Sequence, residues 1–172
     1  MTHPIDEFEL FYNQHVEAIT RYVSRRVPSQ SRDDVVAMVF IVAWKKFRTN
    51  PDPSLPWLYR IAHYKVLHEL RRVGKSPVHL ESDSLGEVRN DRSNAHSSEV
   101  INAIGILRPK DAELIRLIFW EGLSRSEASQ VLGCSVNAVN VRYHRAMVKL
   151  RDELGRNKLT PFTMGDIIFG QG

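Results

Sequence analysis

The chain has 172 residues, with 24 Lys and Arg against 20 Asp and Glu, and an apolar share typical of a folded protein. This length excludes a disulfide-stapled miniprotein and a large α/β barrel, and it fits one domain or two small ones. A single Cys excludes an internal disulfide and a Cys-rich zinc site. No apolar run reaches the roughly 18 residues of a membrane span, and the acidic first residues hold no apolar signal sequence. We therefore expect a cytoplasmic protein without membrane insertion.

Apolar residues at three- and four-residue spacing predict three helices in the first part of the chain. These helices cover residues 4–27, 31–47 and 56–73. Ser31 and Asp34 have the spacing of a capping box at the start of the second helix. Pro56 is a favourable first residue for the third helix. Residues 1–73 are expected to form one helical domain.

The composition changes after the third predicted helix. Residues 74–98 are rich in Ser and charged side chains and poor in apolar ones, which predicts a flexible linker. Helical periodicity resumes at Glu99, and Gly155 is the predicted end of the last helix. The second domain is therefore expected to span residues 99–156, followed by a tail of unknown role at residues 157–172. The predicted fold class is all-α, with two small helical domains.

The second predicted domain contains a helix-turn-helix pattern. Ser124 and Glu127 form a capping box at the start of a short helix. Gly133 can adopt the left-handed turn conformation, and Ser135 then caps a final helix from Val136 to about Leu154. In this layout the second helix normally lies in the major groove of DNA.

Periodicity divides the final helix into two faces. The side chains expected to face the core are Val139, Tyr143, Ala146 and Leu150. Those expected to face outward, towards DNA, are Asn137, Asn140, Val141, His144, Arg145 and Lys149. Four cations and no acid occur between Val136 and Arg151, as a phosphate-facing helix requires. Asn140 could contact adenine through a bidentate amide, and the alternative interpretation of this face is a solvated basic surface.

Two segments of the first domain match a known family, and the second domain matches it again. The segments are Asp33-Asp-Val-Val-Ala-Met-Val-Phe-Ile-Val-Ala-Trp44 and Pro56-Trp-Leu-Tyr-Arg-Ile-Ala62, with Arg71-Arg72 after them. They resemble region 2 of the extracytoplasmic-function sigma factors of bacterial RNA polymerase. The second domain resembles region 4 of that family, on Leu107, Pro109, Glu121-Gly-Leu-Ser124, Glu127-Ala128, Leu132-Gly133, Ser135, Val139, Arg142, Arg145-Ala146 and Leu150-Arg151.

The resemblance covers roughly residues 8–73 and 99–154 and implies a function. The protein would bind core RNA polymerase, direct it to promoter DNA and help to open the −10 element. The outward residues of the final helix, from Asn137 to Lys149, would contact the −35 element. It would not be an enzyme, and it would need no cofactor. An anti-sigma factor is a further expected partner.

The third predicted helix carries the expected −10 site. Its candidate residues are Arg60, His63, Tyr64, His68, Arg71 and Arg72, with Lys75 on the same face. A basic face bearing aromatic rings suits a separated strand, because cations hold phosphates and rings stack on bases. Tyr64 stands where the family often has an Asn that recognises an unstacked base. A Tyr can stack there but cannot offer the paired donor and acceptor of an amide.

The resemblance also implies a polymerase-binding site on the second helix. Its candidate residues are Asp33, Asp34, Ala37, Met38 and Ile41. The family usually has polar residues at the positions of Ala37 and Met38. Because this helix is apolar on most sides, we expect the polymerase, an inhibitory partner or the second domain to cover it. The two aspartates could alternatively cap the helix.

Three alternatives remain open from the sequence. The chain could be a helix-turn-helix regulator that never contacts polymerase, or a sigma-like protein that acts only through protein contacts. It could also be an enzyme, but it lacks the common catalytic and phosphate-binding motifs. The spacing of His63 and His68 does not suit a metal site on a helix, so no metal is expected. Cys134 is predicted to be a small buried thiol without a redox role.

Overall fold

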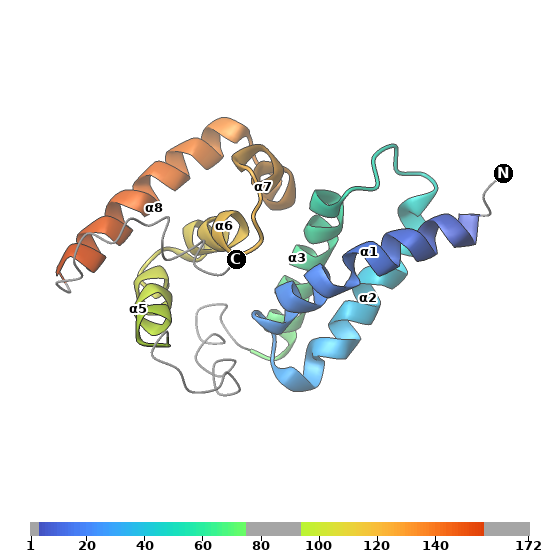
Figure 1. Ribbon diagram of the computed structural model, residues 1–172, viewed down its shortest axis with the longest axis horizontal. Helices are drawn as coiled ribbons and strands as arrows, with labels where there is room; N and C mark the ends of the chain where they lie inside the picture. The colour runs from blue at the N-terminus through green and yellow to red at the C-terminus, as the bar shows by residue number, and fades with distance from the viewer. Residues whose placement is uncertain (1–3, 75–93, 157–172) are drawn as a thin grey trace. The chain divides into compact units, whose positions relative to one another are not determined.

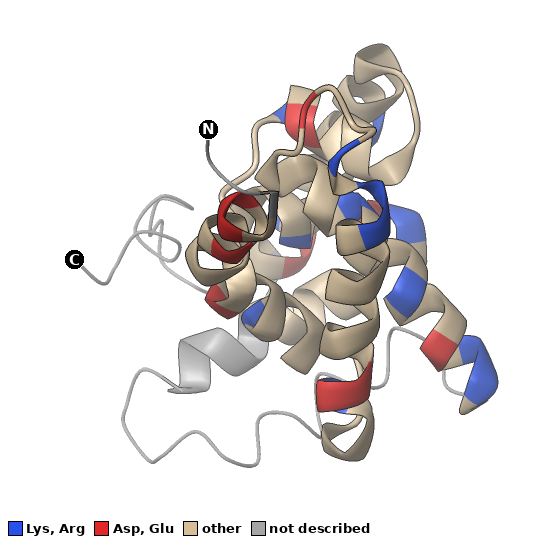
Figure 2. Ribbon diagram, turned by 90° about the vertical axis from the view of Figure 1, so that its right-hand side faces the viewer, with Lys and Arg blue, Asp and Glu red and all other residues tan. Residues whose placement is uncertain are grey.

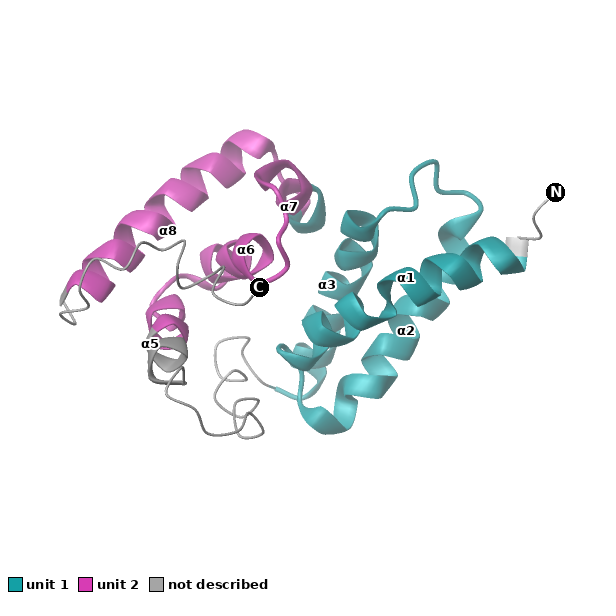
Figure 3. Ribbon diagram, in the orientation of Figure 1, with its two compact units in different colours: residues 1–87, 130–132 teal, residues 88–129, 133–172 magenta. Residues whose placement is uncertain are grey.

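The computed structural model of the protein describes residues 4–74 and 94–156, and within these ranges it contains seven α-helices and no strand (Figure 1). The predicted all-α fold is confirmed. The chain divides into two compact units (Figure 3). The first comprises residues 1–87 and 130–132, and the second comprises residues 88–129 and 133–172.

Three helices that pack against one another form the first unit. They are α1 (Pro4–Ser24), α2 (Ser29–Phe47) and α3 (Leu55–Arg72). The buried residues recur at helical spacing, because only one stripe of each helix faces the other two. They include Ile19, Tyr22, Val23, Val35, Val39, Ala43, Leu58, Ala62, Val66 and Leu70. The ring of Phe8 lies 5.0 Å from that of Trp44 and 5.2 Å from that of Phe47, which joins α1 to α2 through aromatic contacts.

Two predicted helix boundaries in this unit are wrong. Helix α1 ends at Ser24, three residues before the predicted end. Helix α2 begins at Ser29, directly after Pro28, whose extended backbone already forms the N-terminal boundary. The capping box of Ser31 and Asp34 is therefore absent. Ser31 is buried inside the helix and hydrogen-bonds to the carboxylate of Glu69 on α3.

Four described helices belong to the second part of the chain. They are α5 (Asn94–Gly105), α6 (Pro109–Phe119), α7 (Arg125–Leu132) and α8 (Val136–Arg156). Helix α5 begins inside the predicted linker of residues 74–98, and Gly155 lies within α8 and does not end it. Most of that linker and the predicted tail at residues 157–172 lie outside the described residues.

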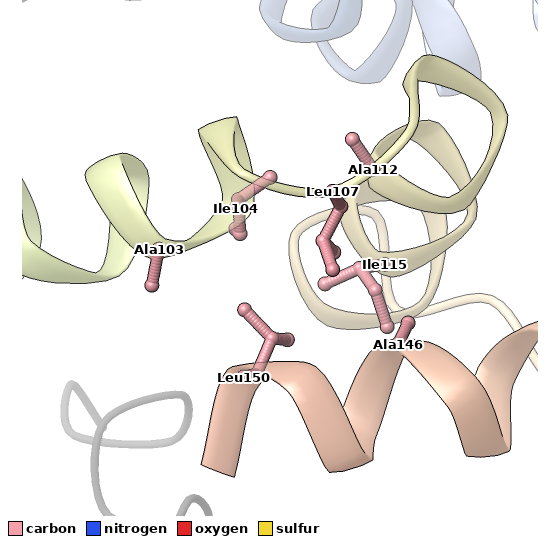
Figure 4. Packing of buried hydrophobic residues seen from close by; sticks show 7 residues of the cluster. All are labelled: Ala103, Ile104, Leu107, Ala112, Ile115, Ala146 and Leu150. Carbon is pink, nitrogen blue, oxygen red and sulfur yellow. The ribbon is translucent and has the colours of Figure 1, made fainter. Parts of the chain in front are cut away.

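A compact apolar cluster fixes the orientation of α8 within the second unit (Figure 4). It contains Ala103, Ile104, Leu107, Ala112, Ile115, Ala146 and Leu150. Ala146 and Leu150 are one helical turn apart, so burying both of them commits one stripe of α8 to the core. The opposite face of α8 therefore points away from this core.

Candidate nucleic-acid interface

The capping box predicted before α7 is confirmed. The backbone N–H of Glu127 donates to Ser124 Oγ at 3.2 Å, and the backbone N–H of Ser124 donates to Glu127 Oε2 at 2.8 Å. These two bonds satisfy donors that a helix start would otherwise leave unpaired. The preceding Gly122 has φ +69°, a left-handed conformation that glycine adopts without steric cost. The first helix of the motif is therefore fixed at its N-terminus.

The turn between α7 and α8 also has the predicted chemistry. Gly133 has φ +63°, and the backbone N–H of Cys134 donates to the carbonyl oxygen of Ser129 at 3.1 Å. Ser135 Oγ accepts a hydrogen bond from the backbone N–H of Ala138 at 3.2 Å, which caps α8. Cys134 is half-buried, and its Sγ lies 3.9 Å from Arg142 Nη1. The thiol thus packs in the turn of the motif.

The faces of α8 follow the predicted division. Val139, Ala146 and Leu150 are buried, and Tyr143 is half-buried. Of the predicted DNA-facing residues, Asn140 is half-buried and the rest are exposed: Asn137, Val141, His144, Arg145 and Lys149. Their contacts with DNA stay predictions.

The charge on α8 is unevenly distributed along the helix (Figure 2). Its acids, Asp152 and Glu153, come only after Arg151. Arg145 is exposed, whereas the half-buried Arg142 points one guanidinium nitrogen at the turn. The acid-free portion of α8 can therefore approach phosphates without a competing negative charge.

One side-chain contact across the motif was not predicted. Arg125, the first residue of α7, donates from Nη1 to Asn140 Oδ1 at 3.2 Å. The guanidinium carbon of Arg125 also lies 5.5 Å from the ring centroid of Tyr143. Sequence spacing could not reveal the contact, because it depends on the angle between α7 and α8.

The exposed face of α3 carries most of the predicted −10 residues. Arg60, Tyr64, His68 and Arg71 are exposed, and 54% of Tyr64 is accessible. The guanidinium carbon of Arg60 lies 5.9 Å from the centroid of the Tyr64 ring. A cation thus stands beside an exposed aromatic ring, the pair of groups that binds single-stranded nucleic acid. Lys75 lies outside the described residues.

His63 is oriented differently from the other predicted −10 residues. It is half-buried, and its Nδ1 lies 3.4 Å from the hydroxyl oxygen of Tyr22 on α1. Its ring is still 5.9 Å from that of Tyr64, in an edge-on arrangement. His63 therefore packs within the helical bundle and contacts the ring of Tyr64 through an edge-on arrangement.

Arg72 is held by an ion pair within α3. Its Nε and Nη2 donate to the two carboxylate oxygens of Glu69 at 2.8 and 2.7 Å. Hydrogen bonds from Arg72 and then from Ser31 lower the pKa of Glu69 to about 2. The same pairing raises the pKa of Arg72. Part of the charge predicted to face DNA at this end of α3 is thus already compensated by a buried carboxylate.

The exposed face of α2 is largely apolar. Met38 is 45% exposed, Ile41 46% and Trp44 43%, and Ala37 is exposed beside them. Asp33 and Asp34 are also exposed, but they lie beyond the first turn of the helix and do not cap it. The capping role considered for the two aspartates is therefore wrong. The five predicted polymerase-binding residues share a surface, and their role stays a prediction.

The described residues form neither a metal-binding cluster nor a membrane-spanning helix. Within residues 4–74 and 94–156, no three His, Cys, Asp or Glu side chains are grouped so that they could hold a metal ion. In the same ranges, no helix has the length and apolarity needed to cross a membrane.

Comparisons with known proteins match both parts of the chain. The sequence model of sigma-70 region 2 matches residues 11–76, and that of sigma-70 region 4 matches residues 97–150. RNA polymerase sigma factor CnrH of Cupriavidus metallidurans is 34% identical over 140 residues, which are 72% of this chain and 73% of CnrH. ECF RNA polymerase sigma factor SigD of Mycobacterium tuberculosis is 29% identical over 152 residues, or 79% of this chain and 71% of SigD. The chain belongs to the extracytoplasmic-function sigma factors.

Solved structures agree with this assignment. CnrH, in a complex with the cytosolic domain of CnrY, superposes on the sigma factor with a TM-score of 0.63 and 28% identity, covering 88% of this chain and 89% of CnrH. RpoE of Bartonella quintana, in a complex with the anti-sigma factor NepR, has a TM-score of 0.62, covers 88% of this chain and 99% of RpoE, and shares the fold at 21% identity. The predicted family is confirmed, and the function of the protein is promoter-directed transcription initiation with RNA polymerase.

Proposed function

We propose that this sigma factor recognises the −35 element as duplex DNA with the exposed face of α8. The observation that carries this proposal is the cation-rich, acid-free stretch of α8 opposite a stripe buried in the core. Arg145 and Lys149 would bind phosphates, and Asn137, Asn140, Val141 and His144 would contact base edges. The capped turn before α8 supports this role, because it holds the helix at a fixed angle to α7.

The exposed face of α3 would contact the −10 element after the strands separate. Tyr64 would stack on an unpaired base, and Arg60, His68 and Arg71 would bind the strand's phosphates. His63 would act through its contact with Tyr64, and Arg72 through its ion pair with Glu69. The protein would therefore contribute binding surfaces and no catalytic group, and it would act in the bacterial cytoplasm, where promoter DNA is transcribed.

The apolar surface of α2 would dock on core polymerase. Met38, Ile41 and Trp44 together expose more apolar area than isolated surface residues usually do, as expected at a protein interface. Asp33 and Asp34 would form its charged rim. An anti-sigma factor is proposed as a second partner, since the related CnrH and RpoE were solved in complexes with CnrY and NepR.

A purified transcription assay tests the whole proposal. The promoter would come from sequencing the transcripts made when the protein is overproduced. With core polymerase and that promoter, the sigma factor should yield a run-off transcript of defined start. Absence of a transcript, together with no co-purification with core polymerase, would contradict it.

A matched pair of variants tests the polymerase surface. Ile41→Gln should weaken binding to core polymerase at least about fivefold, because it places a polar group at an apolar contact. Ile106→Gln alters an isoleucine of similar exposure, 49%, on the other unit and should leave binding unchanged. Equal behaviour of the two variants would remove α2 from the polymerase interface.

Salt dependence tests the phosphate contacts of α8. Arg145→Ala should weaken duplex binding for all sequences and lower the slope of log affinity against log salt by about one. Lys110→Ala removes an equal, exposed charge from α6 and serves as the control. A salt slope that Arg145→Ala leaves unchanged would contradict the phosphate contact.

A further inference from the structure

The amide of Asn140 is held by a neighbour on the other helix of the motif. Its Oδ1 accepts a hydrogen bond of 3.2 Å from Arg125 Nη1. Arg125 has a second anchor, because its guanidinium carbon lies 5.5 Å from the centroid of the Tyr143 ring. Tyr143 is half-buried, and its own ring lies 6.3 Å from that of Phe119 on α6. Arg125 thus contacts two residues of α8, Asn140 and Tyr143, and α8 itself packs against the core of the second unit.

This bond makes the oxygen end of the amide the less favourable one for a contact with DNA. The oxygen and nitrogen of an amide point in opposite directions from the same carbon, so an oxygen aimed at Arg125 turns the NH₂ group away from it. Bidentate recognition of adenine needs both ends, since the oxygen must accept from N6 while the NH₂ donates to N7. The amide oxygen keeps a second lone pair, but an N6 amino group that used it would place its own donor hydrogens beside the positive charge of the Arg125 guanidinium.

We propose that Arg125 is a positioning residue that sets the base preference of Asn140. The NH₂ group of Asn140 then acts as a donor alone. It favours a base whose acceptor has no amino donor beside it in the major groove, either guanine through O6 and N7 or thymine through O4. Adenine is disfavoured because its N7 acceptor lies next to the N6 amino donor, and cytosine because it presents only a donor. This inference rests on the proposed placement of α8 in the major groove, and it replaces the adenine contact expected from the sequence.

A selection experiment on the full-length protein with core polymerase tests the proposal. A promoter library with a randomised −35 element is selected by the wild type and by Asn140→Ala, Arg125→Ala, Arg125→Lys and the double alanine variant. The wild type should enrich guanine or thymine at one position. At that position Asn140→Ala should reduce the preference about five- to tenfold, the low end of the range for a good base contact, because only one end of the amide contributes.

The arginine variants carry the decisive comparison. Arg125→Ala should shift the preference at the same position towards adenine by about fivefold, because no cation then lies beside the amide oxygen that accepts from N6. Arg125→Lys keeps a cationic donor and should retain part of the wild-type preference. The double variant should match Asn140→Ala at that position, since Arg125 acts there only through Asn140.

The outcomes separate this inference from the proposed function. An enriched −35 sequence whose bases are the same for Arg125→Ala and the wild type would overturn the inference alone. An effect of Arg125→Ala at a position that Asn140→Ala leaves unaffected would also overturn it, since Arg125 would then contact the base itself. A wild-type protein that enriches no −35 sequence would overturn the proposed role of α8 and the inference together. Thermal unfolding of each variant, expected to be unchanged because Arg125 is exposed, rules out a loss of fold as the cause.

Discussion

The exposed faces of α3 and α8 both carry cations at helical spacing, yet different side chains accompany those cations. On α8 they are two asparagines, an exposed valine and His144, which suit the donor, acceptor and methyl edges inside a duplex groove. On α3 they are Tyr64 and His68, and rings suit the open faces of unpaired bases. The comparison indicates that the composition around the cations distinguishes a duplex-binding helix from a strand-binding helix.

The two helices also differ in whether an acidic side chain pairs with their cations. On α3, Arg72 is bound through Nε and Nη2 by Glu69, a buried carboxylate that also accepts a hydrogen bond from Ser31 of α2. On α8, Arg145 belongs to a stretch of sequence without any acid. Counting Lys and Arg therefore overestimates the charge that α3 can direct at DNA.

The largest expected effect comes from removing a core contact of α8 while leaving α3 intact. Leu150 is buried in the core of the second unit, and Leu150→Ala should lower its free energy of unfolding by about 2–5 kcal/mol. Duplex −35 binding should fall with it, whereas binding of a single-stranded −10 oligonucleotide by the polymerase complex should persist. Val148→Ala, at a residue 41% exposed on the same helix, is the control and should change stability by less than about 0.5 kcal/mol. Parallel loss of both DNA activities would contradict the division of labour between the helices.

Removing the ring of Tyr64 should give the next largest effect. Tyr64→Ala should weaken open-complex formation by about 1–3 kcal/mol, because one stacked base loses its aromatic partner. Closed-complex binding should change little, and Tyr64→Phe should retain most of the activity. Permanganate reactivity of unpaired thymines, compared with gel-shift binding, measures the two stages. Equal losses at both stages would mean that the ring has a structural role.

Arg71 and Arg72 are neighbours on α3, and comparing them tests whether the ion pair with Glu69 keeps Arg72 from binding DNA. Arg71→Ala should lower the salt slope for a single-stranded −10 oligonucleotide by about 0.7, the value for one phosphate contact. Arg72→Ala should leave that slope nearly unchanged and lower stability instead, since it leaves Glu69 without its main partner. Fluorescence anisotropy titrations at several salt concentrations compare the two variants. Identical slopes would show that the ion pair does not withhold Arg72 from DNA.

The smallest predicted effect is a pH dependence of stability. The folded-state pKa of Glu69 is lowered to about 2, so its ion pair stabilises the protein above the ordinary pKa of a glutamate, and this contribution is lost as the pH falls towards 2. Because Arg72 is largely exposed, the contribution should be less than about 1 kcal/mol.

Urea unfolding at pH 7, 4 and 3 measures this contribution as the difference between wild type and Glu69→Gln. The difference should shrink as the pH falls. Glu17→Gln breaks an exposed pair, in which Glu17 lies 3.5 Å from Arg21, and it should show no such trend. A difference between wild type and Glu69→Gln that stays constant from pH 7 to pH 3 would refute the low pKa.

Local features of this protein could be predicted from the sequence, because caps and periodicity depend on neighbouring residues. The Ser124 and Ser135 caps, the turn at Gly133 and the buried stripe of α8 are of this kind. The capping box assigned to Ser31 failed because Pro28 starts the helix earlier and Ser31 serves a contact with α3. The pairing of Arg72 with Glu69 has ordinary i, i+3 spacing, but its strength depends on the burial of Glu69.

Contacts between helices could not be predicted in this way. The bond from Arg125 to Asn140 spans 15 residues and depends on how α7 crosses α8. The half-buried state of His63 depends on Tyr22 of α1, which lies opposite it in the bundle. Periodicity assigns a residue to a face of its helix, whereas the packing of a second helix decides whether that residue is available to a ligand.

Site-specific crosslinking tests the central claim most directly. A photoreactive amino acid would replace Val141 on α8 or Tyr64 on α3, and each protein would be assembled with core polymerase on the promoter. The replacement at Val141 should crosslink to the duplex −35 element in closed and open complexes alike. The replacement at Tyr64 should crosslink to one strand of the −10 element, and only after the strands open. Crosslinks from both positions to the same element, or a crosslink from position 64 of equal yield in closed complexes, would contradict the account.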